Sequence, residues 1–330
     1  MRILVVGGAG YIGSHMVKML LDAGQNVVTL DNLVNGHRDA VLGGEFVLGD
    51  LGDTVLLDGL FRSHTFDAVM HFASFIQVGE SVKDPAKYYR NNVSCTLNLL
   101  DAMVTHGVRK FIFSSTAAIF GEPCRTPIDE AHPREPINPY GRSKLMVEQV
   151  LADYDLAYGL KSVCLRYFNA AGADPDGRLG ERHDPETHLI PLVLQAASGR
   201  RESISVYGDN YATPDGSCIR DYIHVADLCE AHFLALEYLL NRTSSAAYNL
   251  GNGKGFSVYE VIESARRVTG KTINVVRESR RDGDPAVLVA DSSLARKTLG
   301  WTPGYSDLDT IVGHAWRWEQ GRDKRGSGHG

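Results

Sequence analysis

The stretch RILVVGGAGYIGSHMVKMLLDAG, residues 2–24, decides the fold of this chain. Residues 2–6 are a short apolar run ended by glycine, which is typical of a buried strand. Residues 11–23 carry a helical pattern, and the helix N-terminus supplies amide donors and a favourable dipole for phosphate. Three spaced glycines permit a tight turn, close approach of the backbone to a pyrophosphate, and close helix–sheet packing: Gly7, Gly10 and Gly13.

An acidic residue follows the second predicted strand, residues 26–30. Asp31 can accept hydrogen bonds from both ribose hydroxyls and would repel a 2′-phosphate, so it favours NAD over NADP. A glycine triplet alone is a weak signal, and Asp31 could instead be a turn residue before Asn32. The strand before the glycines and the helix after them favour the dinucleotide site.

Strands and helices continue to alternate through the first half of the chain. This alternation implies right-handed βαβ units and a mainly parallel sheet covered on both faces. We therefore predict an α/β fold with a Rossmann-type doubly wound parallel sheet. The remaining predicted strands are 45–48, 67–70, 109–113 and 161–166, and the helices are 54–63, 84–106, 140–158, 187–198, 224–240, 257–269 and 307–319.

The regular alternation fails after about residue 170, where Gly, Pro and Asp cluster at 172–185 and 208–217. We expect an NAD-binding domain over 1–170, with some later segments returning to it. Residues 171–320 should form a smaller, irregular, mainly substrate-binding lobe. The polar, glycine-rich tail at 321–330 is predicted to be disordered.

The composition is that of an ordinary globular protein, with 43% hydrophobic and 22% charged residues among 330. A net charge of −6 favours neither nucleic acid nor anionic membrane, so local groups must hold any anionic ligand. The five cysteines show no CxxC spacing, which argues against a disulfide framework or a zinc site. No apolar run reaches the ~18 residues of a membrane span. We expect a cytoplasmic protein without a metal.

A YxxxK motif stands at the start of the predicted helix 140–158. Tyr140 and Lys144 are four residues apart, so both side chains project from one face of the helix. A nearby ammonium favours the phenolate and lowers the tyrosine pKa from about 10, which makes Tyr140 a candidate general base. Pro139 suits a helix start. An isolated YxxxK often lies on a surface helix, but its position after a Rossmann half favours catalysis.

The GxxGxxG spacing of the glycines resembles that of the extended short-chain dehydrogenase/reductase family. Asp50-Leu51 resembles the family's adenine-contacting pair, and Phe72-Ala73 resembles the segment along the cofactor, although both could simply pack in the core. The resemblance implies a cofactor site made of Gly7, Gly10, Tyr11, Ile12, Gly13, Asp31, Asn32, Asp50, Leu51, Phe72, Ala73, Asn91, Thr116, Tyr140, Lys144 and Phe168.

A hydroxyl residue should complete the catalytic group at the end of the predicted strand 109–113. By resemblance to the family, Thr116 bonds the reacting sugar oxygen, where sugar epimerases more commonly carry Ser. Ser114 and Ser115 are neighbours that could be mistaken for it, and only one face of the strand points at the substrate. Similar sugar-nucleotide dehydratases carry Asp-Glu after this Thr. Here Ala117 and Ala118 cannot transfer protons, which argues against dehydration.

From about residue 2 to 318, the chain is most similar to the UDP-galactose 4-epimerases. The resemblance implies that Tyr140 takes the proton of the sugar 4-hydroxyl while bound NAD takes the C4 hydride, and that both return after the 4-keto sugar turns over. The segments that carry it include VGESVKDPAKYYRNN (78–92), NPYGRSKLMVEQ (138–149), LRYFNAAGA (165–173), THLIP (187–191), CIRDYIHVADL (218–228), YNLGNGKGFSV (248–258) and RRDGDPAVLVAD (280–291).

The same resemblance implies a nucleotide-sugar site. Arg220 and Arg281 match diphosphate-binding arginines, whose planar fork bonds phosphate oxygens in pairs; on composition alone both would be solvent-exposed. Leu288 matches a position that gates the pocket beside the sugar C2 substituent, or else it packs inward. Many relatives carry Asn at His188, some carry Lys at Ile76, and many carry Tyr at Phe120. The remaining matches are Asn169, Leu189, Tyr207 and Asp284.

The implied substrates are UDP-glucose and UDP-galactose. The helices at 84–106 and 140–158 resemble the family's dimer helices and imply a homodimer, although their apolar residues could equally be buried within one chain. The alternatives are another NDP-sugar 4-epimerase, acting on UDP-N-acetylglucosamine or UDP-glucuronate, and a non-catalytic NAD-binding regulator. The intact Thr116, Tyr140 and Lys144 count against the regulator, because a binding module has no use for them.

Overall fold

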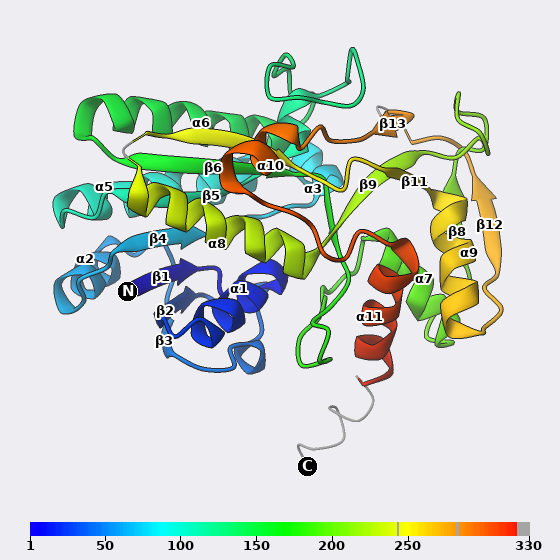
Figure 1. Ribbon diagram of the computed structural model, residues 1–330, viewed down its shortest axis with the longest axis horizontal. Helices are drawn as coiled ribbons and strands as arrows, with labels where there is room; N and C mark the ends of the chain where they lie inside the picture. The colour runs from blue at the N-terminus through cyan, green and yellow to red at the C-terminus, as the bar shows by residue number, and fades with distance from the viewer. Residues whose placement is uncertain (243, 282–283, 322–330) are drawn as a thin grey trace.

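The structure is a computed structural model that describes residues 1–242, 244–281 and 284–321. Its larger sheet has seven parallel strands in the order β10-β6-β5-β4-β1-β2-β3 within the described residues (Figure 1). The strand order reverses between β1 and β4, and ligands of such sheets bind at this switch point, beyond the carboxyl ends of the strands. The strands are β1 (Arg2–Val6), β2 (Asn26–Asp31), β3 (Glu45–Leu48), β4 (Ala68–His71), β5 (Lys110–Thr116), β6 (Lys161–Tyr167) and β10 (Ala246–Leu250).

Helices cover both faces of this sheet. Along β1, Ile3 and Val5 join a core with α1 (Tyr11–Asp22) and α8 (Val225–Asn241). The alternate residues of β1, Leu4 and Val6, join a second core on the opposite face. That core contains α2 (Thr54–Ser63), α5 (Cys95–Thr105) and α6 (Pro139–Tyr158). A strand buried on both faces needs a continuous apolar run, which explains RILVV and confirms the predicted doubly wound sheet.

The predicted helix at 84–106 is not one uninterrupted α-helix. It consists of α4 (Pro85–Tyr89), a π-helical turn η2 (Arg90–Ser94) and α5, and α3 (Val78–Lys83) precedes it. The turn buries Asn92, whose amide accepts from the backbone N of Phe75 at 2.9 Å and donates to its carbonyl at 3.0 Å. The wider turn therefore fixes the loop after β4, which lies over the cofactor cavity described below.

The smaller lobe follows β6. One sheet joins β7 (Asn169–Ala171), β9 (Ile219–His224), β11 (Gly255–Ser257) and β13 (Val287–Leu288), and β8 (Ile204–Tyr207) pairs with β12 (Val275–Glu278). Ile190, Val261 and Ile311 belong to the apolar core that its helices share. These helices are α7 (Leu189–Ala197), α9 (Val258–Thr269) and α11 (Leu308–Gln320), as the sequence predicts.

Some elements from beyond residue 170 lie with the larger sheet. Strand β10 is part of that sheet, and α8 packs on one of its faces. Helix α10 (Ser293–Leu299), which was not predicted, packs against both. The expected disordered tail at 321–330 lies, apart from Gly321, outside the described residues. Among the described residues, no helix has the length and apolar content that a membrane span requires.

Candidate active site

The glycine loop between β1 and α1 is built so that side chains do not fit. Gly7 has a φ of +78°, and a Cβ there would lie 2.5 Å from the backbone N of Ala73. A Cβ on Gly13 would lie 2.1 Å from the carbonyl oxygen of Gly7. Gly10 is the N-cap of α1, where it has no side chain to bond the first-turn amides. The loop therefore fits a pyrophosphate group, which these amides can bind.

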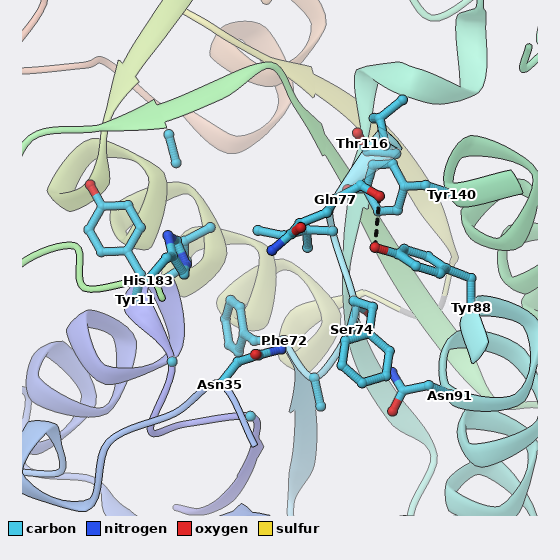
Figure 2. Close-up of a pocket in the computed structure, with 18 of the residues that line it drawn as sticks. Tyr11, Asn35, Phe72, Ser74, Gln77, Tyr88, Asn91, Thr116, Tyr140 and His183 are labelled. Carbon is cyan, nitrogen blue, oxygen red and sulfur yellow. Dashed lines mark hydrogen bonds between the residues drawn. The ribbon is translucent and has the colours of Figure 1, made fainter. Parts of the chain in front are cut away.

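A cavity of about 830 Å³ opens at this loop, beyond the carboxyl ends of the strands (Figure 2). It runs from the start of α1 past the end of β2 to the ends of β5 and the start of α6. Almost all the predicted cofactor residues line it: Gly7, Gly10, Tyr11, Ile12, Gly13, Asp31, Asn32, Asp50, Leu51, Phe72, Ala73, Asn91, Thr116, Tyr140 and Phe168.

Asp31 combines the two roles that the sequence left open. Its carboxylate is 8% exposed and lines the cavity at the end of β2. It also accepts hydrogen bonds from the backbone N of Ala9 at 2.9 Å and of Leu33 at 2.8 Å. Asp31 is thus a turn residue as well as a candidate ribose acceptor. The loop 33–37, which Asp31 holds in place, also lines the cavity and was not predicted. The loop turns sharply at Leu33, which has a positive φ of 59°.

Thr116 and Tyr140 come together where β5 ends and α6 begins (Figure 2). Asn138 caps α6 by accepting from the backbone N of Gly141 at 2.8 Å. A Cβ on Gly141 would lie 2.4 Å from the carbonyl oxygen of Ala118, so this glycine lets the helix approach η3 (Ala117–Phe120) after β5. The Thr116 hydroxyl accepts from the backbone N of Ala118 at 3.1 Å, and Thr116 is close enough to Tyr140 to lower the pKa of its phenol. Both residues line the cavity, as predicted.

The neighbouring serines point elsewhere. Ser114 shares a 2.6 Å hydrogen bond with the hydroxyl of Tyr167, and Ser115 donates at 2.6 Å to Oε1 of Glu148. Neither serine is among the residues that line the cavity. Of the three consecutive hydroxyls, Thr116 alone lines it.

Lys144 lies behind these hydroxyls. Its Nζ donates to Oγ of Ser74 at 2.7 Å and to the carbonyl oxygen of Ser114 at 2.8 Å. Burial lowers the pKa of Lys144 to about 7. Burial also raises the pKa of Tyr140, and Thr116 opposes this rise. The expectation that Lys144 lowers the pKa of Tyr140 is therefore wrong: the pKa is raised, because the effect of burial is larger than that of Thr116.

A second cavity of about 240 Å³ adjoins the first and shares Asn169, His188, Arg220 and Asp284 with it. Arg220 is not solvent-exposed, since its side chain is 13% exposed and forms an ion pair with Asp284. The second cavity is also lined by three further predicted substrate residues: Leu189, Tyr207 and Arg281.

Arg281 is exposed, and its guanidinium carbon lies 3.8 Å from the centre of the Tyr207 ring. This stacking holds the side chain at the second cavity while leaving its N–H groups available.

Leu288 lines the first cavity from β13, opposite Arg220 of β9. It also packs against the apolar cluster that contains Ile119 and Phe120, so lining the cavity and packing inward do not exclude each other. Val287 and Val289 are not among the lining residues, in agreement with the alternation of a strand.

Two groups at the cavity escaped the sequence analysis. Tyr88 lines the cavity, and its hydroxyl donates to the carbonyl oxygen of Gln77 at 2.7 Å (Figure 2). The second group, which we name the Glu–His cluster, lies on the loop between β7 and α7 and consists of Glu181, His183, Glu186 and His188. The resemblance implied a role for His188 alone, and the spacing ExHxxExH is the sequence signal that marks all four residues.

The Glu–His cluster is strongly charged. Burial opposes the ionisation of Glu181, but His188 and His183 outweigh it and lower the glutamate's pKa to about 2. Burial likewise opposes the charge on His183, but Glu181 and Glu186 outweigh it and raise its pKa to about 10. Opposite charges therefore hold the cluster together next to the cavity.

The comparisons with known proteins agree with this geometry. Residues 3–251 match the model of the NAD dependent epimerase/dehydratase family. A UDP-glucose 4-epimerase from Halalkalibacterium halodurans is 56% identical over 320 residues, covering 97% of this chain and 96% of the relative.

Solved structures are also similar. The UDP-glucose 4-epimerase from Brucella ovis, in complex with NAD, has a TM-score of 0.94 and 54% identity, covering 96% of this chain and 97% of that one. The UDP-Glc/GlcNAc 4-epimerase from Campylobacter jejuni has a TM-score of 0.85 and 45% identity, covering 97% and 99%. The chain therefore belongs to the NAD-dependent epimerase/dehydratase family, alongside the UDP-glucose 4-epimerases.

Proposed function

We propose that this protein interconverts UDP-glucose and UDP-galactose by inverting the sugar at C4. It is an NAD-dependent UDP-sugar 4-epimerase, as its relatives are. The observation that carries the proposal is the single cavity of about 830 Å³ in which the glycine loop and Asp31 lie together with Thr116 and Tyr140. A dinucleotide cradle and a hydroxyl pair suited to proton transfer thus open on one space.

The residues present fit NAD. The glycine loop, where Cβ atoms would meet backbone, leaves room for the pyrophosphate, and Asp31 lies where a ribose needs an acceptor. Among the described residues of the loop 33–37 that line the cavity, none is an arginine or a lysine, the residues that would favour a 2′-phosphate. When bound, NAD supplies a reversible acceptor for the hydride on C4 of the sugar.

The chain's own groups handle the proton. Tyr140 accepts the proton of the sugar 4-hydroxyl and later returns it, so the reaction has no net redox change. Thr116, which lines the cavity together with Tyr140, orients the same sugar oxygen. Because burial raises the pKa of Tyr140, the phenolate needs a nearby cation, which the nicotinamide of bound NAD would provide.

The UDP moiety is assigned to the second cavity. Arg220 and Arg281 supply bidentate donors for the diphosphate, and Asn169 and Leu189 line the same space. Arg220 is paired with Asp284, so a bound diphosphate has to share or replace this partner. Because the two cavities adjoin, a nucleotide bound in the second cavity can place its sugar in the first, next to Tyr140.

Incubation with UDP-galactose without added cofactor tests the proposal. We expect UDP-glucose to form, because a cofactor that ends each cycle unchanged can stay bound to the protein. Formation of a keto sugar or an unsaturated product instead would contradict it, as would a reaction that requires stoichiometric NAD. Heat-treated protein is the control.

Leu288 favours a second activity, the epimerisation of UDP-N-acetylglucosamine. It lines the cavity and is smaller than an aromatic residue, which leaves space beside the sugar C2 substituent. The similar Campylobacter jejuni enzyme is a UDP-Glc/GlcNAc 4-epimerase. We expect this substrate to be turned over more slowly than UDP-galactose.

We also propose a cytoplasmic homodimer that associates through α5 and α6. Much of their apolar surface is buried within one chain, including Leu99, Met103 and Val147. Met146, however, is 41% exposed on α6. Light scattering should give twice the chain mass of 36.1 kDa, and Met146→Glu should lower the measured mass.

The proposed cytoplasmic location is supported by the five free thiols, which suit a reducing compartment.

A further inference from the structure

The Glu–His cluster has the geometry of a metal site. One ligand atom of each side chain lies within 4.8 Å of all the others. Nδ1 of His183 lies 3.2 Å from Oε1 of Glu181 and 3.6 Å from Oε1 of Glu186. Nδ1 of His188 lies 3.7 Å from the same Glu186 oxygen and contacts Oε1 of Glu181 more closely. Ligand atoms around a tetrahedral zinc ion, at bonds of about 2.0–2.2 Å, are roughly 3.3–3.6 Å apart.

The orientation of His183 distinguishes this cluster from a set of ordinary ion pairs. Its Nδ1 is buried and makes no hydrogen bond with any described residue, although two carboxylate oxygens are within 3.6 Å. An N–H that served one carboxylate would point at its oxygen. Binding of a metal ion would displace the proton of His183, and its Nδ1 lone pair would then face an ion shared with the two carboxylates and the second imidazole.

The donor set selects the kind of cation. Two imidazole nitrogens and two carboxylate oxygens suit zinc, whereas magnesium and calcium prefer oxygen ligands alone. The two carboxylates offset the charge of a divalent ion, and both glutamate side chains are only 5% exposed, so water cannot easily replace them. Four protein ligands leave no open position, which is typical of a structural site.

We infer that Glu181, His183, Glu186 and His188 bind one zinc ion that fixes the loop between β7 and α7 over the cofactor cavity. The loop is already held from several sides. The indole of Trp318 donates to the carbonyl oxygen of Glu181 at 3.1 Å, and the Arg182 guanidinium forms an ion pair with Asp39.

The metal site lies on the cofactor side of the cavity. The His183 ring lies edge-on to Tyr11 of α1, with centroids 6.4 Å apart, away from Tyr140 (Figure 2). The zinc would therefore hold His183 in its contact with Tyr11, at the start of the helix that follows the glycine loop. It takes no part in proton transfer.

Cobalt titration of the full-length protein with its retained nucleotide tests the inference, because tetrahedral Co²⁺ absorbs strongly in the visible region. After EDTA dialysis, we expect a band that saturates at about one Co²⁺ per chain and disappears when Zn²⁺ is added. His183→Asn and Glu186→Gln should each weaken Co²⁺ binding by more than about tenfold, since even the loss of an outer-shell partner costs that much. Circular dichroism checks that both variants are folded.

Asp39→Asn is the matched control, because it removes the loop's ion pair with Arg182 but no ligand. It should retain the cobalt band. The absence of a saturable band in the parent would overturn the inference, as would parent-like titration of both ligand variants. Equal loss of the band in Asp39→Asn would also contradict the inference, because the band would then depend on the order of the loop and not on the four ligands. These readouts do not depend on epimerase activity.

Discussion

Nζ of Lys144 lies 2.8 Å from the carbonyl oxygen of Ser114, so the ammonium is anchored to β5 two residues before Thr116. The bond ties the first turns of α6 to the end of the strand that carries the catalytic hydroxyl. Its cost is the burial of a cation, which lowers the pKa of Lys144 to about 7. The geometry of the site and the electrostatics of the fold are thus linked through one side chain.

The buried lysine predicts a pH-dependent stability difference between the parent and Lys144→Met. Between pH 7 and 10.5, the unfolded chain keeps a proton on this lysine that the folded protein releases. The free energy of unfolding of the parent therefore rises with pH across this window, by up to about 1.4 kcal/mol per unit. Lys144→Met has no such proton to release. Its free energy of unfolding, relative to that of the parent, should therefore be greater at pH 6.5 than at pH 8.5. Urea unfolding at both pH values measures it, and a pH-independent difference would exclude the lowered pKa.

Asp31→Asn should weaken NAD retention more than UDP affinity. The amide preserves the side chain's shape and one acceptor for Ala9 or Leu33, but it loses the charge and an acceptor for the ribose. The NAD content after purification, measured by absorbance of the released nucleotide, should fall. Asp53→Asn is the matched control, because Asp53 caps α2 and does not line the cavity. Equal NAD content in parent and Asp31→Asn would refute the assignment.

Thr116→Val should lower kcat with little change in nucleotide affinity, because it removes a hydroxyl that matters most during proton transfer. Thr116→Ser should retain most of the kcat of the parent, since serine keeps that hydroxyl. Ser114→Ala should be much milder, because Ser114 does not line the cavity and its hydroxyl is hydrogen-bonded to that of Tyr167. Steady-state kinetics on all three variants decide this. A larger loss in Ser114→Ala than in Thr116→Val would show that the wrong hydroxyl has been chosen.

Leu288→Tyr should suppress activity toward UDP-N-acetylglucosamine and spare UDP-galactose, because the larger ring fills space beside the C2 substituent. We expect the ratio of the two kcat/KM values to change by about tenfold or more. Val287→Tyr is the matched control, since Val287 does not line the cavity. If the ratio stays constant in Leu288→Tyr, this residue is not the gate.

Much of the larger sheet and its ligand loop could be predicted from local patterns. The run before Gly7 indicates a strand buried on both faces, and both faces of β1 are indeed packed. The YxxxK spacing predicts a helix that presents Tyr140 and Lys144 on one face, and α6 does so. These features succeed because the relevant periodicity lies within a few consecutive residues.

Other features depend on contacts that no local pattern reveals. The π-helical turn at Asn92 exists because that amide bonds the distant backbone of Phe75. The direction of the Tyr140 pKa shift depends on burial by elements far away in sequence. The Glu–His cluster lies in an irregular loop without helical or strand periodicity, and only folding shows that its four ligand atoms converge.

The turnover of Tyr140→Phe tests the central claim most directly, because the substitution removes only the phenolic hydroxyl from the cavity. We predict that kcat for UDP-galactose falls by about 10²–10⁴-fold while the purified protein keeps its NAD. Tyr154→Phe is the matched control on the same helix, since the Tyr154 hydroxyl bonds Asp101 away from the cavity, and it should turn over like the parent. Turnover of Tyr140→Phe within about threefold of the parent would contradict the assignment of Tyr140 as the base.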